Sequence, residues 1–211
     1  MNITINRLSQ DLRHRLKAPL PGETAQQEVQ VKSDIKFNFP YTIEQAIPAA
    51  VLILLFPEND DIYFFLTERT NEVEHHKGQI SLPGGSWEKG EQLHETAIRE
   101  TEEEIGVSKN QIHYMGSLTP FFTPVTGFMV HPFIGWCNKK PSTNIQIDEV
   151  NKLFTVSLST LLNDQIFQSE NWEIRGQKAI VPFYNFEGRK VWGVTASILS
   201  EFKLILKDMK L

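Results

Sequence analysis

Six of the fourteen residues from Glu91 to Glu104 are glutamates, and Arg99 is the only lysine or arginine among them. Carboxylates three or four residues apart on a helix repel one another, and those near its C-terminal end also face the negative end of the helix dipole. Stability alone would therefore not favour this segment as a helix. The cluster predicts a bound cation, and a hard divalent ion such as Mg²⁺ or Mn²⁺ prefers oxygen ligands.

Helical spacing separates these glutamates into groups. At about 100° per residue, Glu100, Glu103 and Glu104 share an arc of about a hundred degrees. The neighbouring arc has the character of a buried face and holds Leu93, Ala97, Ile98, Thr101 and Ile105. Arg99 lies four residues after Glu95 and four before Glu103, a spacing that predicts ion pairs with both. The alternative is an exposed acidic helix without a ligand, but the ordered spacing favours the cation site.

Glycines flank the predicted helix. Pro83-Gly84-Gly85 forms a tight turn before it, which lets the backbone approach a metal ion, and the Gly85 carbonyl is a candidate ligand. Gly106 stands where a helix commonly ends on glycine. Glu91 lies near the helix start, where a carboxylate complements the free N–H groups, so its predicted role is structural.

The same residues resemble the Nudix hydrolase signature, G-x5-E-x7-R-E-U-x-E-E-x-G-U, in which U is a bulky aliphatic residue. The positions in register are Gly85, Glu91, Arg99, Glu100, Glu103, Glu104, Gly106 and Val107. Thr101 stands where the signature has an aliphatic residue, and this change concerns packing because Thr101 belongs to the buried arc. The resemblance implies an α/β fold of the Nudix type, an α/β/α sandwich with a mixed sheet.

The resemblance also implies a reaction, the metal-dependent hydrolysis of a nucleoside diphosphate linked to another moiety. It makes Glu100 and Glu104 the main metal ligands and Glu103 a third ligand or the general base, with Arg99 holding Glu103 in the catalytic group. Family members also take the base from a loop outside the signature. Glu149, in the segment QIDEVNKLF, is a candidate for that role, and an ordinary surface acid is the alternative.

Length and charge limit the remaining possibilities. The 211 residues suffice for a single domain, and we expect an N-terminal helix and extended arm over 1–45 before a Nudix hydrolase domain over 46–211. A net charge of −5 without a basic run argues against binding nucleic acid or an anionic membrane.

The single cysteine, Cys137, excludes an internal disulfide and suits a cytoplasmic protein, as does the lack of a signal peptide. By analogy with the family, a homodimer through the N-terminal arm is a candidate assembly.

Glycine, proline and polar residues mark the boundaries of the expected elements. An amphipathic N-terminal helix is predicted by Ile5, Leu8, Leu12 and Leu16. Strands are expected at 46–56, 61–67, 112–118 and 128–136, with a hairpin of 172–175 and 179–186 around Gly176. A short helix at 156–162 and a closing helix at 195–207 complete the order.

The segment before the helix, LTERTNEVEHHKGQISLPGG, resembles a second motif, L-L-T-x-R-[SA]-x3-R-x3-G-x3-F-P-G-G, of the coenzyme A pyrophosphatase branch. The matching positions are Leu66, Thr67, Arg69, Gly78, Pro83, Gly84 and Gly85. The resemblance implies that a small-molecule diphosphate contacts Arg69, Lys77, Gly78 and Gln79.

Three positions depart from this second motif. Thr70 and Leu82 are mild changes, but Glu74 replaces an arginine that would suit a substrate phosphate. Recognition of the 3′-phosphate of coenzyme A would then depend on Arg69, His75 or Lys77. The histidines His75 and His76 otherwise have the character of surface residues.

Coenzyme A as the substrate would yield 3′,5′-adenosine bisphosphate and 4′-phosphopantetheine, and its thioesters would yield the acylated form. The alternative within the fold is an ADP-ribose or nucleotide-sugar pyrophosphatase. A non-catalytic nucleotide-binding module would lack the metal glutamates, which are all present here. Phe121, Phe122 and Phe128 are candidates for a wall against adenine or pantetheine, with ordinary core packing as the alternative.

Overall fold

The protein is described from a computed structural model that covers residues 4–32, 38–70, 78–174 and 176–210. The helices are α1 (Ile5–Arg15), α2 (Glu23–Gln27), α3 (Leu93–Ile105), α4 (Leu158–Leu162) and α5 (Gly193–Asp208), with short 3-10 turns η1 (Ile43–Gln45), η2 (Lys109–Gln111) and η3 (Asp164–Ile166). Within these ranges no helix has the length and apolar character needed to span a membrane.

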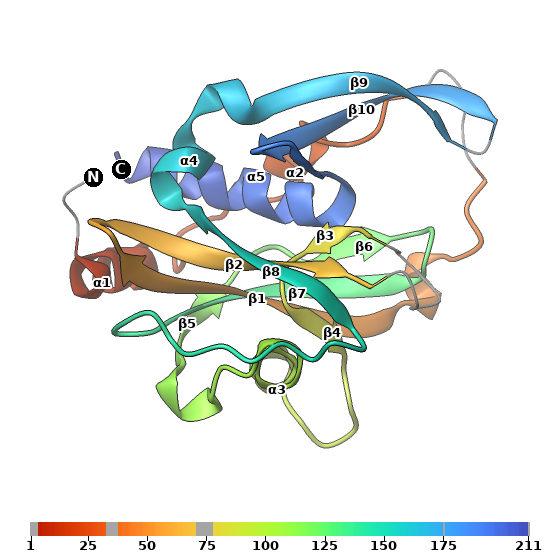
Figure 1. Ribbon diagram of the computed structural model, residues 1–211. Helices are drawn as coiled ribbons and strands as arrows, with labels where there is room; N and C mark the ends of the chain where they lie inside the picture. Colours follow the sequence, from red (N-terminus) through yellow and green to blue (C-terminus); the bar gives the residue numbers. More distant parts are fainter. Residues whose placement is uncertain (1–3, 33–37, 71–77, 175, 211) are drawn as a thin grey trace.

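The strands form two sheets. The larger sheet contains β1 (Ile47–Glu58), β2 (Asp61–Arg69), β3 (Ile80–Ser81), β4 (Gly84–Ser86), β5 (His113–Ser117), β6 (Phe121–Thr123), β7 (Phe128–Trp136) and β8 (Val150–Ser157). Its long strands β1 and β7 pair in parallel and the other pairs are antiparallel, so the sheet is mixed. Helix α3 covers one face and α5 the other (Figure 1). The predicted α/β/α sandwich with a mixed sheet is confirmed.

Strand β1 lies at the centre because both of its faces are apolar. Ile53 and Leu55 pack on the α5 side, in the cluster that includes Phe202. The alternate residues Leu52 and Leu54 pack on the α3 side. A strand covered on both faces has a continuous apolar sequence and not an alternating one, which explains the uninterrupted run before residue 57.

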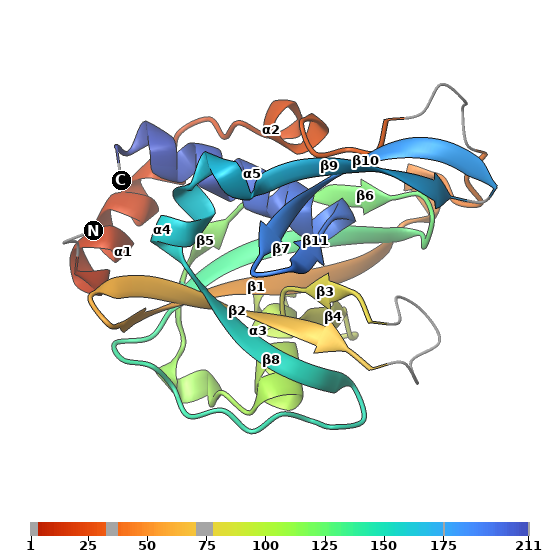
Figure 2. The same cartoon turned by 45° about the horizontal axis from the view of Figure 1, so that its top comes forward.

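The N-terminal helix α1 packs against the α5 side of the sheet. Ile5, Leu8 and Leu12 are buried in the α5-side core, as the amphipathic pattern predicted. Figure 2 shows α1 beside α5 at the edge of the sheet. The following arm is less extended than predicted, because it contains α2 and η1.

Helix α2 is held against α5 by a buried carboxylate. The side chain of Glu201 accepts hydrogen bonds from the Gly22 N–H, from Gln26 Nε2 and from both the N–H and the hydroxyl of Thr119. These neutral donors satisfy a carboxylate that has no solvent exposure. The arm is therefore fixed to the C-terminal helix at this point.

The second sheet lies beyond α5 and joins β9 (Phe167–Ile174), β10 (Gln177–Phe186) and β11 (Arg189–Val191) (Figure 1). The predicted hairpin around Gly176 is confirmed, although β9 begins earlier than expected. The helix predicted over 156–162 is wrong at its start. Val156 pairs with Phe64 in β8, and α4 begins only after Ser157, whose hydroxyl accepts the Thr160 N–H as its N-cap.

Candidate active site

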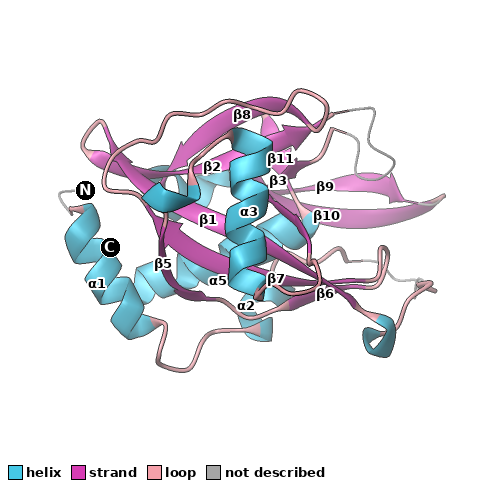
Figure 3. Cartoon of the chain, turned by 90° about the horizontal axis from the view of Figure 1, so that it is seen from below, coloured by secondary structure: helices cyan, strands magenta, loops and turns pink. Residues whose placement is uncertain are grey.

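Helix α3 carries the glutamates and crosses the face of the sheet over β1 and β4 (Figure 3). Its first turn is closed by a capping box in which the Gln92 N–H donates to the Glu95 carboxylate. The predicted pair between Glu95 and Arg99 is therefore wrong, because Glu95 is engaged at the helix start. The helix ends at Gly106 with φ of 72°, and a Cβ there would lie 2.7 Å from the Asn144 carbonyl oxygen.

Arg99 joins the helix to the turn that precedes it. Its Nε and Nη2 donate to the two oxygens of Glu91 at 3.1 and 3.0 Å, and Nη2 also donates to the Ser86 carbonyl. Its Nη1 donates to Glu100 and to Glu103, each at 2.9 Å. The predicted contact with Glu103 is present. One guanidinium thus orients three carboxylates of the signature, which explains why a single arginine accompanies them.

Glu91 is the structural carboxylate of this group. Besides Arg99, it accepts the Thr96 hydroxyl at 2.7 Å and the Glu88 N–H at 3.0 Å. The Arg99 hydrogen bond is the main reason that the pKa of Glu91 falls from 4.5 to about 2. The carboxylate is therefore charged at neutral and mildly acidic pH.

We expect Glu91→Gln to lower the free energy of unfolding at pH 7 by up to about 3 kcal/mol, the equivalent of this pKa shift. Because the pKa is lowered in the folded state, the stabilisation is complete above pH 4.5 and is lost as the pH falls toward 2. Urea titrations of both proteins at pH 7 and pH 3 measure the difference. Glu88→Gln is the control, since Glu88 makes no side-chain ion pair within the described residues. Equal losses in the two variants would contradict the expectation.

Glu104 is the most buried of the signature glutamates, with 3% of its surface exposed. Its Oε2 accepts the Gly84 N–H at 3.2 Å, and its Oε1 lies 3.4 Å from Arg69 Nη1. Burial raises the pKa of Glu104 to about 7, while Arg69 and the Gly84 N–H oppose that rise. Arg69, predicted to contact substrate, therefore lies beside the carboxylates.

The two glycines of the turn face different neighbours. Gly84 has φ of +151°, and a Cβ there would lie 2.2 Å from the Ala50 carbonyl oxygen. At Gly85 a Cβ would lie 2.5 Å from the Glu100 carboxylate carbon. Gly84 thus lets β4 pack on β1, whereas Gly85 leaves space for the carboxylate of Glu100.

A fourth carboxylate, Glu149, belongs to the group. It lines a cavity of about 320 Å³ together with Glu103 and Gln146. The charge of Glu149 contributes to raising the pKa of both Glu100 and Glu104, although burial is the main cause for each. No sequence pattern indicated Gln146, because its place in the cavity lining depends on a loop conformation that spacing does not reveal.

The donor set fits a hard divalent cation. Glu100, Glu103 and Glu104 supply carboxylate oxygens from one helix face, beside the backbone of Gly85, where no Cβ intervenes. Within the described part of the chain, no three acidic, histidine or cysteine side chains converge on one point. Each of the three carboxylates is paired to an arginine in this arrangement, Glu100 and Glu103 to Arg99 and Glu104 to Arg69.

The other predicted substrate contacts lie next to Arg69. The Arg69 N–H donates to the Gln79 carbonyl, and the Gly78 N–H donates to the Arg69 carbonyl. Lys77 lies outside the described residues, as do Glu74, His75 and His76. Arg69, Gly78 and Gln79 are thus brought together at the end of β2.

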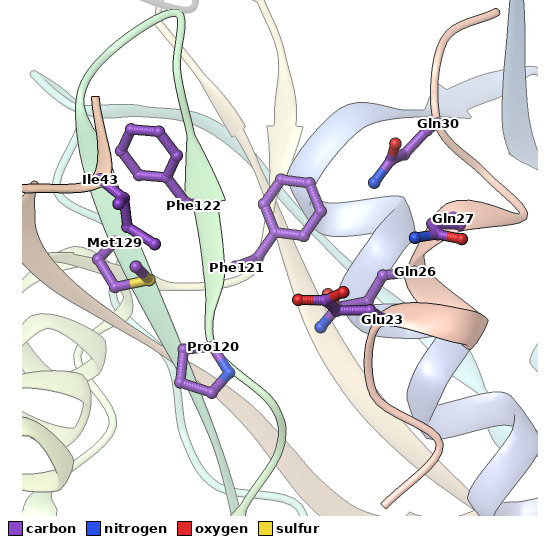
Figure 4. A pocket seen from close by; sticks show the side chains of 9 residues that line it. All are labelled: Glu23, Gln26, Gln27, Gln30, Ile43, Pro120, Phe121, Phe122 and Met129. Atoms are coloured by element: carbon purple, nitrogen blue, oxygen red, sulfur yellow. The ribbon is translucent and has the colours of Figure 1, made fainter. Parts of the chain in front are cut away.

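A second cavity, of about 230 Å³, lies between α2 and the strands β6 and β7 (Figure 4). Phe121, Phe122 and Met129 line it from the sheet, and the carboxamides of Gln26 and Gln27 from α2 and of Gln30 from the segment after α2 line the other side. Phe121, Phe122 and Phe128 were candidates for either a ligand wall or ordinary core packing. Phe128 is absent from the lining of this cavity and packs against the α5-side core, as the second alternative expects. The cavity shares no lining residue with the one beside Glu103.

Comparison with known proteins identifies the family. Residues 46–174 match the NUDIX domain model. Over 159 residues the chain is 36% identical to Nudix hydrolase 15, mitochondrial, of Arabidopsis thaliana, covering 72% of this chain and 55% of that protein. Over 119 residues it is 33% identical to peroxisomal coenzyme A diphosphatase ndx-8 of Caenorhabditis elegans, covering 55% of this chain and 51% of that protein. The chain thus spans about half the length of each of these relatives.

The fold agrees with this match. The crystal structure of RenU, a Nudix hydrolase from M. smegmatis, superposes with a TM-score of 0.55 at 15% identity, covering 86% of this chain and 96% of that chain. At this identity the superposition shows a shared architecture. The family model covers more than half of the sequence and includes helix α3 with its glutamates. The chain belongs to the Nudix hydrolase family.

Proposed function

We propose that the chain is a metal-dependent pyrophosphohydrolase that cleaves the diphosphate of a nucleoside diphosphate derivative. The observation that carries this proposal is the group of four carboxylates, Glu100, Glu103, Glu104 and Glu149, beside Arg69 and a cavity of about 320 Å³. Such an excess of negative charge has no use in stabilising the fold, and a diphosphate substrate would add more. A divalent cation is needed to hold both together.

Nudix hydrolases generally need divalent metal ions. Here Glu100, Glu103 and Glu104 would hold the ion with the carbonyl of Gly85, as Mg²⁺ or Mn²⁺. The bound cation would neutralise charge on the diphosphate and make water more acidic. Arg99 would keep Glu100 and Glu103 on the side of the helix that faces the turn. Arg69 would add positive charge next to the diphosphate.

Glu149 is the proposed general base. Arg99 holds Glu103 at 2.9 Å, whereas no lysine or arginine in the described ranges pairs with Glu149. A general base needs an oxygen that is free to accept a hydrogen bond from the attacking water, and Glu149 lines the cavity. Glu149 would take a proton from the water that attacks phosphorus, and the diphosphate bond would break to give two monophosphate products.

Coenzyme A is the proposed substrate. Two observations support it, namely the motif that places Arg69, Gly78 and Gln79 beside the carboxylates, and the 33% identity to a relative named as a coenzyme A diphosphatase. The products would be 3′,5′-adenosine bisphosphate and 4′-phosphopantetheine.

Residues 1–45 and 46–211 would act as one domain, because α1 contributes Leu8 and Leu12 to the core of the sheet.

We expect coenzyme A to be hydrolysed faster than ADP-ribose, nucleotide sugars or dinucleoside polyphosphates, each tested with Mg²⁺ and with Mn²⁺. Chromatographic separation of substrates and products measures the rates, because a coupled phosphatase would also remove the 3′-phosphate of intact coenzyme A. Coenzyme A and dephospho-coenzyme A should give similar KM values, because Glu74 stands where the motif has an arginine. Preferential cleavage of ADP-ribose would overturn the substrate, and absence of any cleavage would overturn the activity.

A further inference from the structure

Glu149 is carried by a loop, residues 144–149, that lies in the connection from β7 to β8 and contacts the end of α3. On the α3 side the loop is held by the Asn144 N–H, which donates to the Ile105 carbonyl at 2.8 Å, and by the Gln146 N–H, which donates to the Glu104 carbonyl at 2.9 Å. These carbonyls end the helix and would otherwise lack partners. The loop is therefore anchored to the helix that carries the other carboxylates.

On the β8 side the loop closes as a turn. The N–H groups of Glu149 and Val150 both donate to the Gln146 carbonyl, at 3.1 and 2.8 Å. Val150 then pairs with Arg69 across the β2–β8 ladder. The conformation of this turn decides whether the Glu149 side chain faces Glu103 across the cavity.

Thr70, the residue that follows β2, contacts the turn through two hydrogen bonds. Its N–H donates to the Glu149 carbonyl at 3.0 Å, and its hydroxyl donates to the Asp148 carbonyl at 3.0 Å. The other contacts that hold the loop are made by main-chain groups on both sides. The Thr70 hydroxyl is thus the contact that a substitution can remove without changing the backbone.

We propose that Thr70 is a positioning residue for this reaction, acting through Glu149. Its two hydrogen bonds hold the carbonyls on both sides of the Glu149 amide, and so direct the Glu149 side chain into the cavity lined by Glu103 and Gln146. The inference rests on the proposed role of Glu149 as the base. A base must lie within hydrogen-bond reach of the proton that it takes, and small displacements lower the rate steeply.

The test compares Thr70→Val with Thr70→Ser. Valine keeps the shape and the branched Cβ but removes the hydroxyl, while serine retains the donor. We expect Thr70→Val to lower kcat by about tenfold with KM changed less than about twofold, and Thr70→Ser to restore most of kcat. In a Glu149→Gln background, where kcat is already reduced by roughly a hundredfold or more, Thr70→Val should cause no further loss.

Additive effects in this double-mutant cycle, or equal kcat values for the valine and serine variants, would overturn the proposal. Hydrogen exchange of the Glu149 and Val150 amides gives a readout that needs no substrate. These amides should exchange faster in Thr70→Val than in wild type or Thr70→Ser, with the amides of α5 unchanged. If no diphosphate is cleaved, the proposed function fails, and unchanged exchange at both amides would separately exclude positioning by Thr70.

Discussion

Glu104→Gln is expected to lower turnover by at least about a hundredfold while the fold remains intact. Glu104 is proposed as a metal ligand, and charge stabilisation by a metal ion is worth several kcal/mol, each 1.4 kcal/mol being roughly tenfold in rate. Glutamine keeps the volume and can still accept the Gly84 N–H, but it has no charge. Glu103→Gln should also reduce turnover strongly. Steady-state kinetics over a range of Mg²⁺ and Mn²⁺ concentrations measures both.

The same substitution is expected to stabilise the metal-free protein at high pH. The pKa of Glu104 is raised from 4.5 to about 7 in the folded state, so folding favours the protonated acid. Below pH 4.5 Glu104 is protonated in both the folded and the unfolded state and does not change the free energy of unfolding. Between pH 4.5 and 7 it increasingly lowers that free energy, and above pH 7 the loss is complete, at up to about 3 kcal/mol.

Urea titrations in the presence of a metal chelator test the direction of this pH-dependent difference in stability. Glu104→Gln and wild type should be similarly stable at pH 4.5, and the variant should be more stable at pH 8. The matched control is Glu102→Gln, on the same helix but away from the cavity, whose Oε1 accepts the Lys109 N–H. If turnover is unchanged in both Glu103→Gln and Glu104→Gln, the proposed metal site is wrong.

The parts of the site that follow helical geometry were predictable. The predicted buried face of α3 was largely right, since Ala97, Thr101 and Ile105 are buried. The Thr101 hydroxyl donates a hydrogen bond to the Ala97 carbonyl. This hydroxyl therefore costs little at an aliphatic position. Gly106 ended the helix as expected. These features depend on neighbours within about one turn, which sequence spacing describes.

The parts that depend on distant segments were not predictable. Nothing in the spacing of Glu104 indicates that Arg69, 35 residues earlier, pairs with it. The family resemblance made Glu149 a candidate base, but spacing did not indicate that its loop is hydrogen-bonded to Thr70 and to the end of α3. Val156 was assigned to a helix because its pairing with Phe64 is a long-range contact. Tertiary pairing overrides local propensity in such segments.

Substitutions at the adjacent glycines Gly84 and Gly85 are expected to affect stability and activity separately. Gly84→Ala is expected to be the more destabilising of the two. An alanine there would hold φ near +151° and place its Cβ 2.2 Å from the Ala50 carbonyl oxygen and 2.6 Å from the Val51 Cα. The backbone of β1 cannot move without disturbing its pairing with β7. A loss of roughly 3 kcal/mol or more in the free energy of unfolding is expected from backbone strain and overlap together. Thermal and urea unfolding measure it.

Gly85→Ala should have the opposite profile, a folded protein with little activity. Its φ lies outside the left-handed region, and the three atoms nearest to its Cβ would all belong to the Glu100 carboxylate, with Cδ and Oε2 at 2.5 Å. A carboxylate on a flexible side chain can rotate away, so stability should change by less than about 1 kcal/mol. The rotation would move Glu100 from its proposed position as a metal ligand. A displacement of about 1 Å can cost a hundredfold in rate, and kcat should fall by about that factor with weaker binding of Mn²⁺. Full activity in a stable Gly85→Ala protein would show that the Glu100 carboxylate does not act beside Gly85.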